Sequence, residues 1–121
     1  MIDFIIHFTL LIWAHFCGDF ALQFNKMAMN KGSSLKWLTI HVSAYSLPVL
    51  IAALFIFGFS LTAVLYTVLN FGLHWATDFV TSKVSGHFNK QGNQRMFFAT
   101  IGFDQAIHMT CLTLTYLLFM V

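Results

Sequence analysis

Three pairs of histidine and aspartate lie within apolar stretches of this 121-residue chain. The two residues of each pair are four positions apart, which puts both side chains on one face of a helix, about 5–6 Å apart at Cβ. Carboxylate and neutral imidazole are ligands that suit Zn, Mn and Fe. The spacing therefore predicts a site for a divalent transition metal. Its predicted ligands are His15, Asp19, His74, Asp78, Asp104 and His108.

The order of the residues within the pairs also predicts how deep each residue lies relative to its partner. The histidine comes first in the pairs at 15/19 and 74/78, whereas the aspartate comes first in the pair at 104/108. If the last of these helices runs opposite to the other two, every aspartate lies on the same side of its histidine. We therefore expect a layer of three carboxylates beside a layer of three imidazoles.

His41 is expected at a comparable depth, because it follows Lys36 by five positions. Two-metal sites, with ions about 3.5–4 Å apart, activate water and clamp a phosphoryl or acyl group. The three histidines and three aspartates match the number of ligands for two ions bridged by an aspartate. In this hypothesis Asp104 bridges the ions or acts as the general base, and His41 stabilises charge or completes a ligand shell. Asp104 and His41 are thus the predicted catalytic residues.

Two other interpretations of the same residues stay open. Buried His–Asp pairs can be hydrogen-bonded couples that only hold helices together. Aspartate and histidine inside a membrane also serve in ion and proton pathways. A metal centre is preferred because the three pairs share one depth and invert their order with helix direction, which unrelated structural pairs have no reason to do.

The composition indicates what kind of scaffold must position these residues. The chain is 59% hydrophobic and 8% charged, whereas soluble domains carry about 25% charged residues. A water-facing surface cannot be built from this inventory, so we expect a single integral membrane domain over residues 1–121, with the lipid bilayer as its partner. The small net charge of +2 is dispersed, which argues against a nucleic-acid partner.

A helix needs about 20 mostly apolar residues to cross the hydrocarbon core of a membrane, and four such stretches are present. The expected class is therefore all-α, a four-helix transmembrane bundle, with a tight turn at residues 58–60. The expected helices cover residues 2–24, 37–57, 61–82 and 96–120.

All six basic residues fall in two alternate connections of this bundle, at residues 25–36 and 83–95. The positive-inside rule places these connections in the cytoplasm and both termini outside. The expected location is the bacterial inner membrane, crossed several times. Residues 15–26 (HFCGDFALQFNK) and 74–83 (HWATDFVTSK) share the pattern His-aromatic-x-x-Asp-Phe and a closing Lys. Either the bundle consists of two repeated helical hairpins, or the similarity of these two segments is due to chance.

The chain resembles a small bacterial and phage membrane-protein family in four motifs that occur in the same order. They are AHFCGDFALQ, a later His41, HWATDFVTSK and DQAIH. That family is catalogued as a domain of unknown function, and the resemblance covers nearly the whole chain. It brings no established activity but implies ten signature positions. They are His15, Asp19, Gln23, His41, His74, Asp78, Lys83, Asp104, Gln105 and His108. More loosely, the chain is similar to the membrane-bound metal-dependent hydrolases of bacterial inner membranes.

These observations favour a membrane-embedded metal-dependent hydrolase, with one or two ions of Zn, Mn or Fe. Its expected substrate is a phosphoester or lipid-like molecule that arrives from the cytoplasmic leaflet. One alternative is a transporter or channel for ions, protons or metals that uses the same cluster. Another is a structural protein or a phage-encoded modulator of a host membrane protein. A homo-oligomer is expected, and a transport function would need one, because four helices leave little room for a hydrophilic pore within one subunit.

Overall fold

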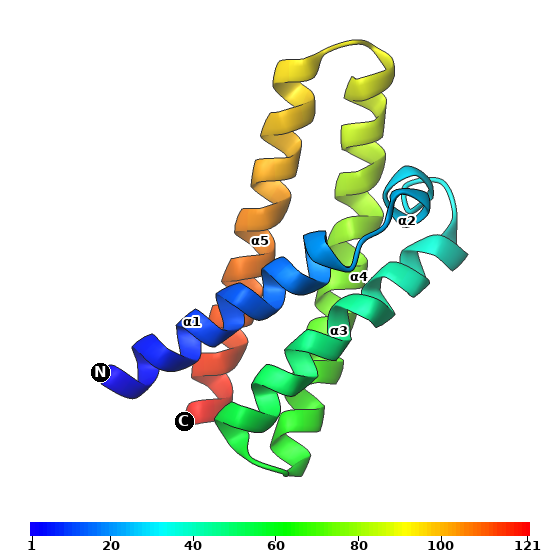
Figure 1. The fold of residues 1–121 in the computed structure, drawn as a ribbon. Coiled ribbons are helices and arrows are strands. Elements are labelled where there is room, and N and C mark those ends of the chain that lie inside the picture. The colour runs from blue at the N-terminus through cyan, green and yellow to red at the C-terminus, as the bar shows by residue number, and fades with distance from the viewer.

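The computed structural model describes residues 1–121 and is entirely helical, without strands (Figure 1). The all-α class expected from the sequence is therefore confirmed. The elements in chain order are α1 (Ile2–Phe16), a turn of π-helix η1 (Cys17–Ala21), α2 (Asn25–Asn30), α3 (Leu35–Phe57), α4 (Leu61–Lys90) and α5 (Gln94–Met120).

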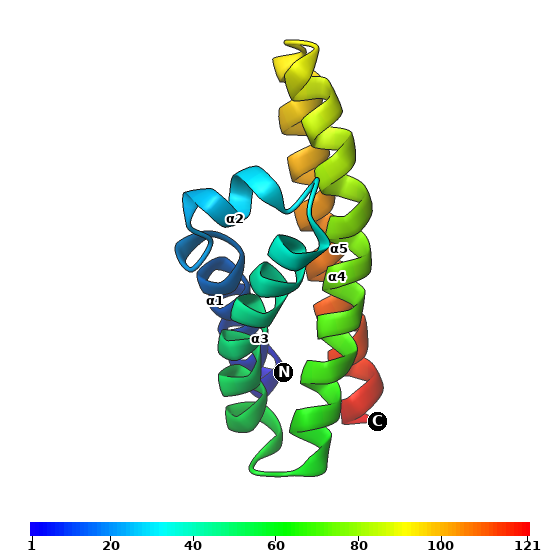
Figure 2. The same ribbon diagram turned by 90° about the vertical axis from the view of Figure 1, so that its right-hand side faces the viewer.

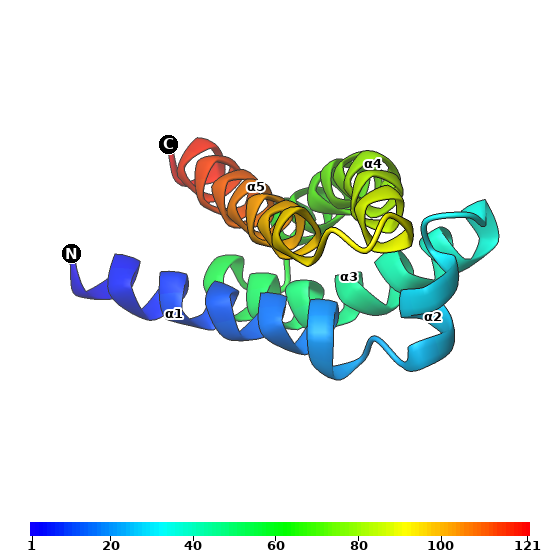
Figure 3. The same cartoon turned by 90° about the horizontal axis from the view of Figure 1, so that it is seen from above.

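The long helices form two layers that cross each other, α1 with α3 and α4 with α5 (Figure 3). Both termini and the α3–α4 turn lie towards one end of the molecule, and α2 and the α4–α5 turn lie towards the other (Figure 1). Helices α1 and α4 therefore run in one general direction, and α3 and α5 run back. This is the arrangement on which the predicted layering of aspartates and histidines depends.

Side-chain caps and two glycines determine where the long helices begin and end. The side chains of Ser34, Ser60 and Asn93 each accept a hydrogen bond from the backbone N–H three residues further on, at 3.1–3.4 Å. Such caps satisfy amide groups that have no partner inside the helix. Gly58 and Gly92 adopt φ angles of 72° and 70° in the two tight connections, a conformation that glycine adopts without steric cost. The tight turn expected at residues 58–60 is present.

The polar stretch at residues 83–95 differs from the prediction. It was expected to be a loop, but α4 continues to Lys90 and α5 begins at Gln94, so that only three residues connect them. Hydropathy locates the end of the apolar zone, whereas the helix ends where its backbone hydrogen bonds end. As a result the α4–α5 hairpin projects well beyond α2 (Figure 2).

The first helix also differs from the expected range 2–24. Regular α-helix stops at Phe16, the wider η1 turn carries the chain to Ala21, and the short helix α2 lies within what was expected to be a loop. Gly18 in η1 packs directly on α3, since a Cβ placed there would lie 2.9 Å from the Cα atom of Tyr45. The close approach of the two backbones brings the neighbouring Asp19 into the bundle.

Many apolar residues lie on the surface of the protein, and many polar residues lie in its interior. Large apolar side chains are exposed on all four long helices, while the buried set contains twelve polar or charged residues beside thirteen hydrophobic ones. Two segments, Ile2–Ala21 and Leu35–Phe57, are long and apolar enough to cross a membrane. Buried polar residues on α4 and α5 lower the average hydropathy of those helices.

The interior changes character along the bundle. Near the termini it is an apolar core, which includes Leu11, Ala53, Tyr66 and Leu112. One or two helical turns closer to α2, the same helix faces bury histidines and aspartates instead. The apolar half holds the helices together and the polar half forms the candidate site.

Candidate metal centre

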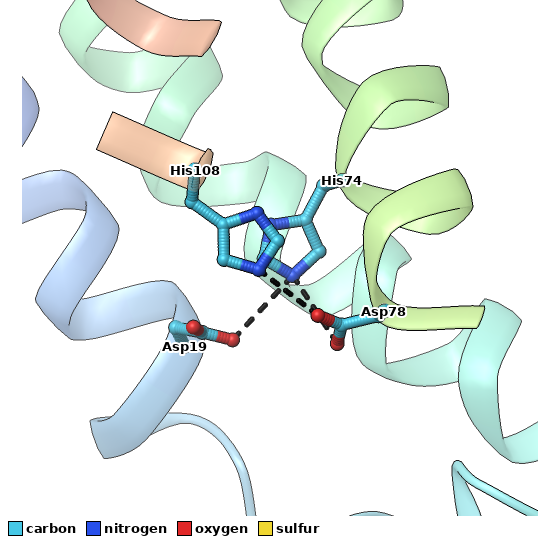
Figure 4. A group of neighbouring side chains, drawn as sticks. All are labelled: Asp19, His74, Asp78 and His108. Carbon is cyan, nitrogen blue, oxygen red and sulfur yellow. Dashed lines mark hydrogen bonds and ion pairs between the residues drawn. The ribbon is translucent and has the colours of Figure 1, made fainter. Parts of the chain in front are cut away.

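Two aspartates and two histidines from three elements meet in the polar half of the bundle (Figure 4). Asp19 comes from η1, His74 and Asp78 from α4, and His108 from α5. One ligand atom from each of the four lies within 4.8 Å of the others. All four residues are at most 2% exposed. Buried carboxylates at this spacing need a positive partner, a proton or a metal ion.

The closest contacts in the cluster join different helices. His108 Nε2 lies 2.9 Å from Asp78 Oδ1 on the neighbouring helix, whereas within α4 the distance from His74 Nε2 to Asp78 Oδ2 is 3.5 Å. The pair at the end of the first helix, His15 and Asp19, is separated by 3.7 Å. The three His–Asp pairs seen in the sequence are therefore parts of one network and not three separate couples.

His41 on α3 lies at the middle of this network and is fully buried. Its Nε2 atom is 3.1 Å from Asp19 Oδ1 and 3.1 Å from Asp78 Oδ2. The same atom is 3.3 Å from His74 Nε2, which itself lies 3.4 and 3.5 Å from the two carboxylate oxygens. Five of the six distances between these four donor atoms therefore lie between 3.1 and 3.5 Å.

Three of these separations, at 3.3–3.5 Å, equal the edges of a metal-coordination tetrahedron, and the two at 3.1 Å are slightly shorter. Zinc binds histidine nitrogen and carboxylate oxygen at about 2.0–2.2 Å, which corresponds to ligand–ligand distances of about 3.3–3.6 Å in a regular tetrahedron. Asp19 Oδ1, one of the four atoms, is buried and receives no well-directed hydrogen bond, although two imidazole nitrogens lie 3.1 and 3.4 Å away. The donor set of His41, His74, Asp19 and Asp78 therefore fits a divalent ion.

Asp104 lies at the edge of the cluster. Its Oδ2 atom is 3.1 Å from His108 Nε2, and its Oδ1 atom accepts a hydrogen bond of 2.5 Å from the Thr81 hydroxyl. His108 Nε2 thus lies between Asp104 and Asp78. Asp78, by contrast, contacts three histidines. Its Oδ2 atom lies near His41 and His74, and its Oδ1 atom lies near His108.

His15 lies beside the cluster, held by Gln105. The amide nitrogen of Gln105 donates to Asp19 Oδ2 at 2.7 Å and to Asp104 Oδ2 at 3.1 Å. Because carboxylates only accept, this orients the amide oxygen of Gln105 towards His15 Nε2, which donates to it at 2.5 Å. The other ring nitrogen of His15 is 3.3 Å from the hydroxyl of Tyr45. Both nitrogens of His15 are therefore engaged in hydrogen bonds.

Stacked rings set the planes of two imidazoles. The ring of Tyr45 stacks on His74 with 3.7 Å between centroids, and His74 stacks on His108 at 3.8 Å. The Nδ1 atoms of His41 and His74 are buried without a hydrogen-bond partner in the protein. For His74, the ring stack therefore replaces the hydrogen bond that usually orients a metal-binding imidazole.

Lys31 contacts the cluster, although its place in the sequence indicates only the topology of the chain. Its Nζ atom forms an ion pair with Asp78 Oδ2 at 3.1 Å. Nothing in the local sequence indicates this contact, because Lys31 follows the short helix α2 and Asp78 lies on α4. Gln105, by contrast, is adjacent to Asp104 and was among the signature positions that the resemblance implied.

The cluster borders a polar cavity of about 200 Å³ on the side of α2. Its lining includes Asp19, Asp104, Gln105 and Lys31. Two carboxylates of the network are therefore accessible to a small polar molecule. In the opposite direction the interior is closed by the apolar core.

The remaining histidines lie outside the site. His7 on α1 contacts the hydroxyl of Tyr116 at 3.0 Å, near the termini. His87 is exposed in the projecting part of α4.

Comparison with known proteins gives one result. Residues 7–121 match the model of a family described as proteins of unknown function, DUF3307. No curated protein and no solved structure matches the chain. The match includes every histidine and aspartate of the cluster, and the chain therefore belongs to the DUF3307 family.

Proposed function

We propose that this protein is a membrane-embedded, metal-dependent hydrolase of a phosphoester or lipid-like substrate that enters from the cytoplasmic leaflet. The observation that carries the proposal is the set of four buried donor atoms at tetrahedral separations, next to a polar cavity. A divalent ion held by these residues would supply an activated water and polarise a phosphoryl oxygen.

The distribution of side chains supports a bundle that crosses the membrane four times. Apolar residues are exposed on α1, α3, α4 and α5, and the charged cluster faces inwards. Helix α4 has 30 residues, or about 45 Å at 1.5 Å per residue, so it spans a hydrocarbon core of about 30 Å and continues beyond it. All six basic residues lie towards the α2 end. This end is the cytoplasmic one in our proposal, which puts both termini outside the bacterial inner membrane.

His41, His74, Asp19 and Asp78 hold the first ion in this proposal. Asp78 Oδ1, His108 and Asp104 would hold a second ion, because His108 Nε2 lies 2.9 Å from Asp78 and 3.1 Å from Asp104. Asp78, and not Asp104 as expected from the sequence, would then be the carboxylate shared by both positions. Catalytic metal sites keep one position open for water or substrate. The second position borders the cavity through Asp104, where this carboxylate is placed to accept a proton from water.

His15, Gln105 and Lys31 support the ligands in this scheme. Gln105 holds Asp19 and Asp104 in fixed orientations. Lys31 balances the negative charge of Asp78. With the histidines neutral, as metal ligands are, three aspartates against one lysine leave the cluster with an excess of negative charge, for which a divalent cation would compensate.

An ion pathway through one subunit is less well supported. A pathway needs polar access from both ends, but the terminal half of the interior is filled by an apolar core that includes Leu11, Tyr66 and Leu112. A site with access from one side only is typical of catalysis or of stable binding.

Elemental analysis of the purified protein, combined with a hydrolysis assay, tests the proposal. We expect one or two transition-metal ions per chain and hydrolysis of a chromogenic phosphoester or a short-chain phosphatidic acid. Both should be lost in His74→Ala and retained in His7→Ala, which changes a histidine outside the cluster. Metal-free protein without hydrolysis, and with full stability after His74→Ala, would overturn the metal centre and leave only a structural role.

A further inference from the structure

A second hollow lies beside the polar cavity of the candidate site. It has a volume of about 670 Å³ and is lined mainly by the loop after α2 and by the projecting part of α4. Four of its lining residues are basic or can become so: Lys31, Lys83, His87 and Lys90. No aspartate lines it, and the chain contains no glutamate. We call this hollow the basic groove.

We propose that the basic groove binds the phosphate group of an anionic phospholipid from the cytoplasmic leaflet. This inference rests on the proposed function and names the class of substrate that its site would take. Half of the six basic residues of the chain line this one groove. Lysine ammonium groups are common ligands of phosphate. Ser33 and Asn89 add neutral polar side chains to the same lining.

Part of the basic groove is held in place by contacts within the protein. Lys83 donates a hydrogen bond of 2.9 Å to the backbone carbonyl of Gly32, which joins α4 to the loop after α2. Gly32 itself packs closely on α4, because a Cβ at this position would lie 3.0 Å from the carbonyl oxygen of Ser82. His87 and Lys90 are exposed further along α4 and make no side-chain hydrogen bond, so they are free to contact a ligand.

The basic groove and the polar cavity are adjacent and share one wall. Both are lined by Lys31, Ser82, Ser85, Ala28 and Phe97. A phosphate in the groove therefore lies beside the cavity that reaches Asp104. Lys31 connects the two, since it lines both and contacts Asp78 Oδ2 at 3.1 Å.

The surroundings of the groove favour a lipid over a soluble anion. Met29, which lines the groove, is 80% exposed, and the neighbouring Phe24 is more than half exposed. Helix α2 lies across the ends of α1 and α3, where their apolar stretches stop (Figure 2). This is the level of the lipid headgroups in a four-crossing bundle, where basic residues attract anionic lipids.

A binding measurement on the full chain in neutral detergent, treated with a chelator, tests this inference. Short-chain phosphatidic acid, short-chain phosphatidylcholine and inorganic phosphate are titrated separately, with ligand-induced thermal stabilisation as the readout. We expect phosphatidic acid to bind most tightly. The double variant His87→Gln/Lys90→Gln should weaken this binding about three- to tenfold, because the charge-assisted contact of Lys90 and the contact of the His87 ring are lost at an exposed site.

Arg95→Gln is the matched control, since it removes a basic residue of the same end that lines neither hollow, and it should bind like the parent chain. Equal losses in the control and the double variant would overturn the groove, as would equally tight binding of phosphatidylcholine. Tighter binding of inorganic phosphate would overturn the lipid assignment. The binding measurement needs neither metal nor turnover. If the protein hydrolyses a soluble phosphoester but does not bind phosphatidic acid, the proposed role of the basic groove is wrong and the proposed hydrolase function stands.

Discussion

Asp78 Oδ1 lies 2.9 Å from His108 Nε2, the shortest His–Asp contact in the protein, and it joins α4 to α5. The other oxygen of Asp78 contacts His41 and Lys31, both at 3.1 Å. One carboxylate therefore connects residues of three helices and a loop. It is the common point of the network, which makes it the most informative residue to change.

Asp78→Asn should be the most damaging of the conservative changes. It removes the charge that balances Lys31 and leaves His41 and His108 without their carboxylate partner, and breaking a buried pair costs about 3–5 kcal/mol. We expect a large fall in Tm and loss of bound metal, measured by thermal denaturation in detergent and by elemental analysis. Asp3→Asn, which changes an exposed aspartate on α1, should leave both unchanged. Similar behaviour of the two variants would contradict the central role of Asp78.

Gln105→Leu should weaken metal binding without abolishing it. In the proposed metal centre Gln105 orients Asp19 and Asp104 without being a ligand, and loss of such supporting hydrogen bonds typically costs about 10–100-fold in metal affinity. Competition with a chromophoric chelator measures the affinity. Gln105→Glu is an informative companion, because a carboxylate cannot donate to Asp19 and should be at least as harmful. Unchanged affinity in both variants would remove Gln105 from the site.

Asp19→Asn and Asp104→Asn should not be additive. Both aspartates accept from the same amide group of Gln105, and residues of one network couple by about 0.5–3 kcal/mol. A double-mutant cycle on the free energy of unfolding measures the coupling. Additive effects would mean that the two carboxylates act independently, in conflict with a single polar network.

Gly18→Ala should disturb the site through the backbone. The added Cβ would lie 2.9 Å from both the Cα and the carbonyl oxygen of Tyr45, so η1 and α3 must separate, at a cost of about 1–3 kcal/mol. Asp19 moves with η1, and metal affinity should fall as well. Gly102→Ala is the matched control. Nothing lies within 4 Å of a Cβ at that position, and alanine there should be neutral or stabilise the helix by up to about 1 kcal/mol.

The proposed topology predicts that a reporter fused after Val121 works only outside the cytoplasm. The reason is that all six basic residues lie at the α2 end of the bundle and the C-terminus lies at the other. A periplasm-active enzyme fused there should be active, and a cytoplasm-only fluorophore should be dark. The same pair of reporters inserted between Gln91 and Asn93 should give the opposite pattern. Reversed results at both positions would place the site in the outer leaflet.

The sequence by itself determined the helical class, the tight turn at residues 58–60 and the helix faces on which the paired histidines and aspartates lie. These follow from local rules. A separation of four positions puts two side chains on one helix face regardless of what surrounds the helix, and inward-facing Asp and His are the polar residues that an apolar chain retains for a purpose. The length of the α4–α5 hairpin was not predictable in this way, because Lys83 to Arg95 are as compatible with helix outside a membrane as with a loop.

Only the tertiary structure decided which residues are partners. The sequence pairs His74 with Asp78, but packing brings Asp78 closer to His41 and His108 on other helices. It also brings in Lys31, which lies 47 positions from Asp78 in the chain, and it leaves His15 bonded to Gln105 at the edge. Spacing along one helix specifies a face, whereas the distance between two faces depends on how closely the backbones approach. Here that distance depends on contacts such as that of Gly18 with Tyr45, which no local pattern encodes.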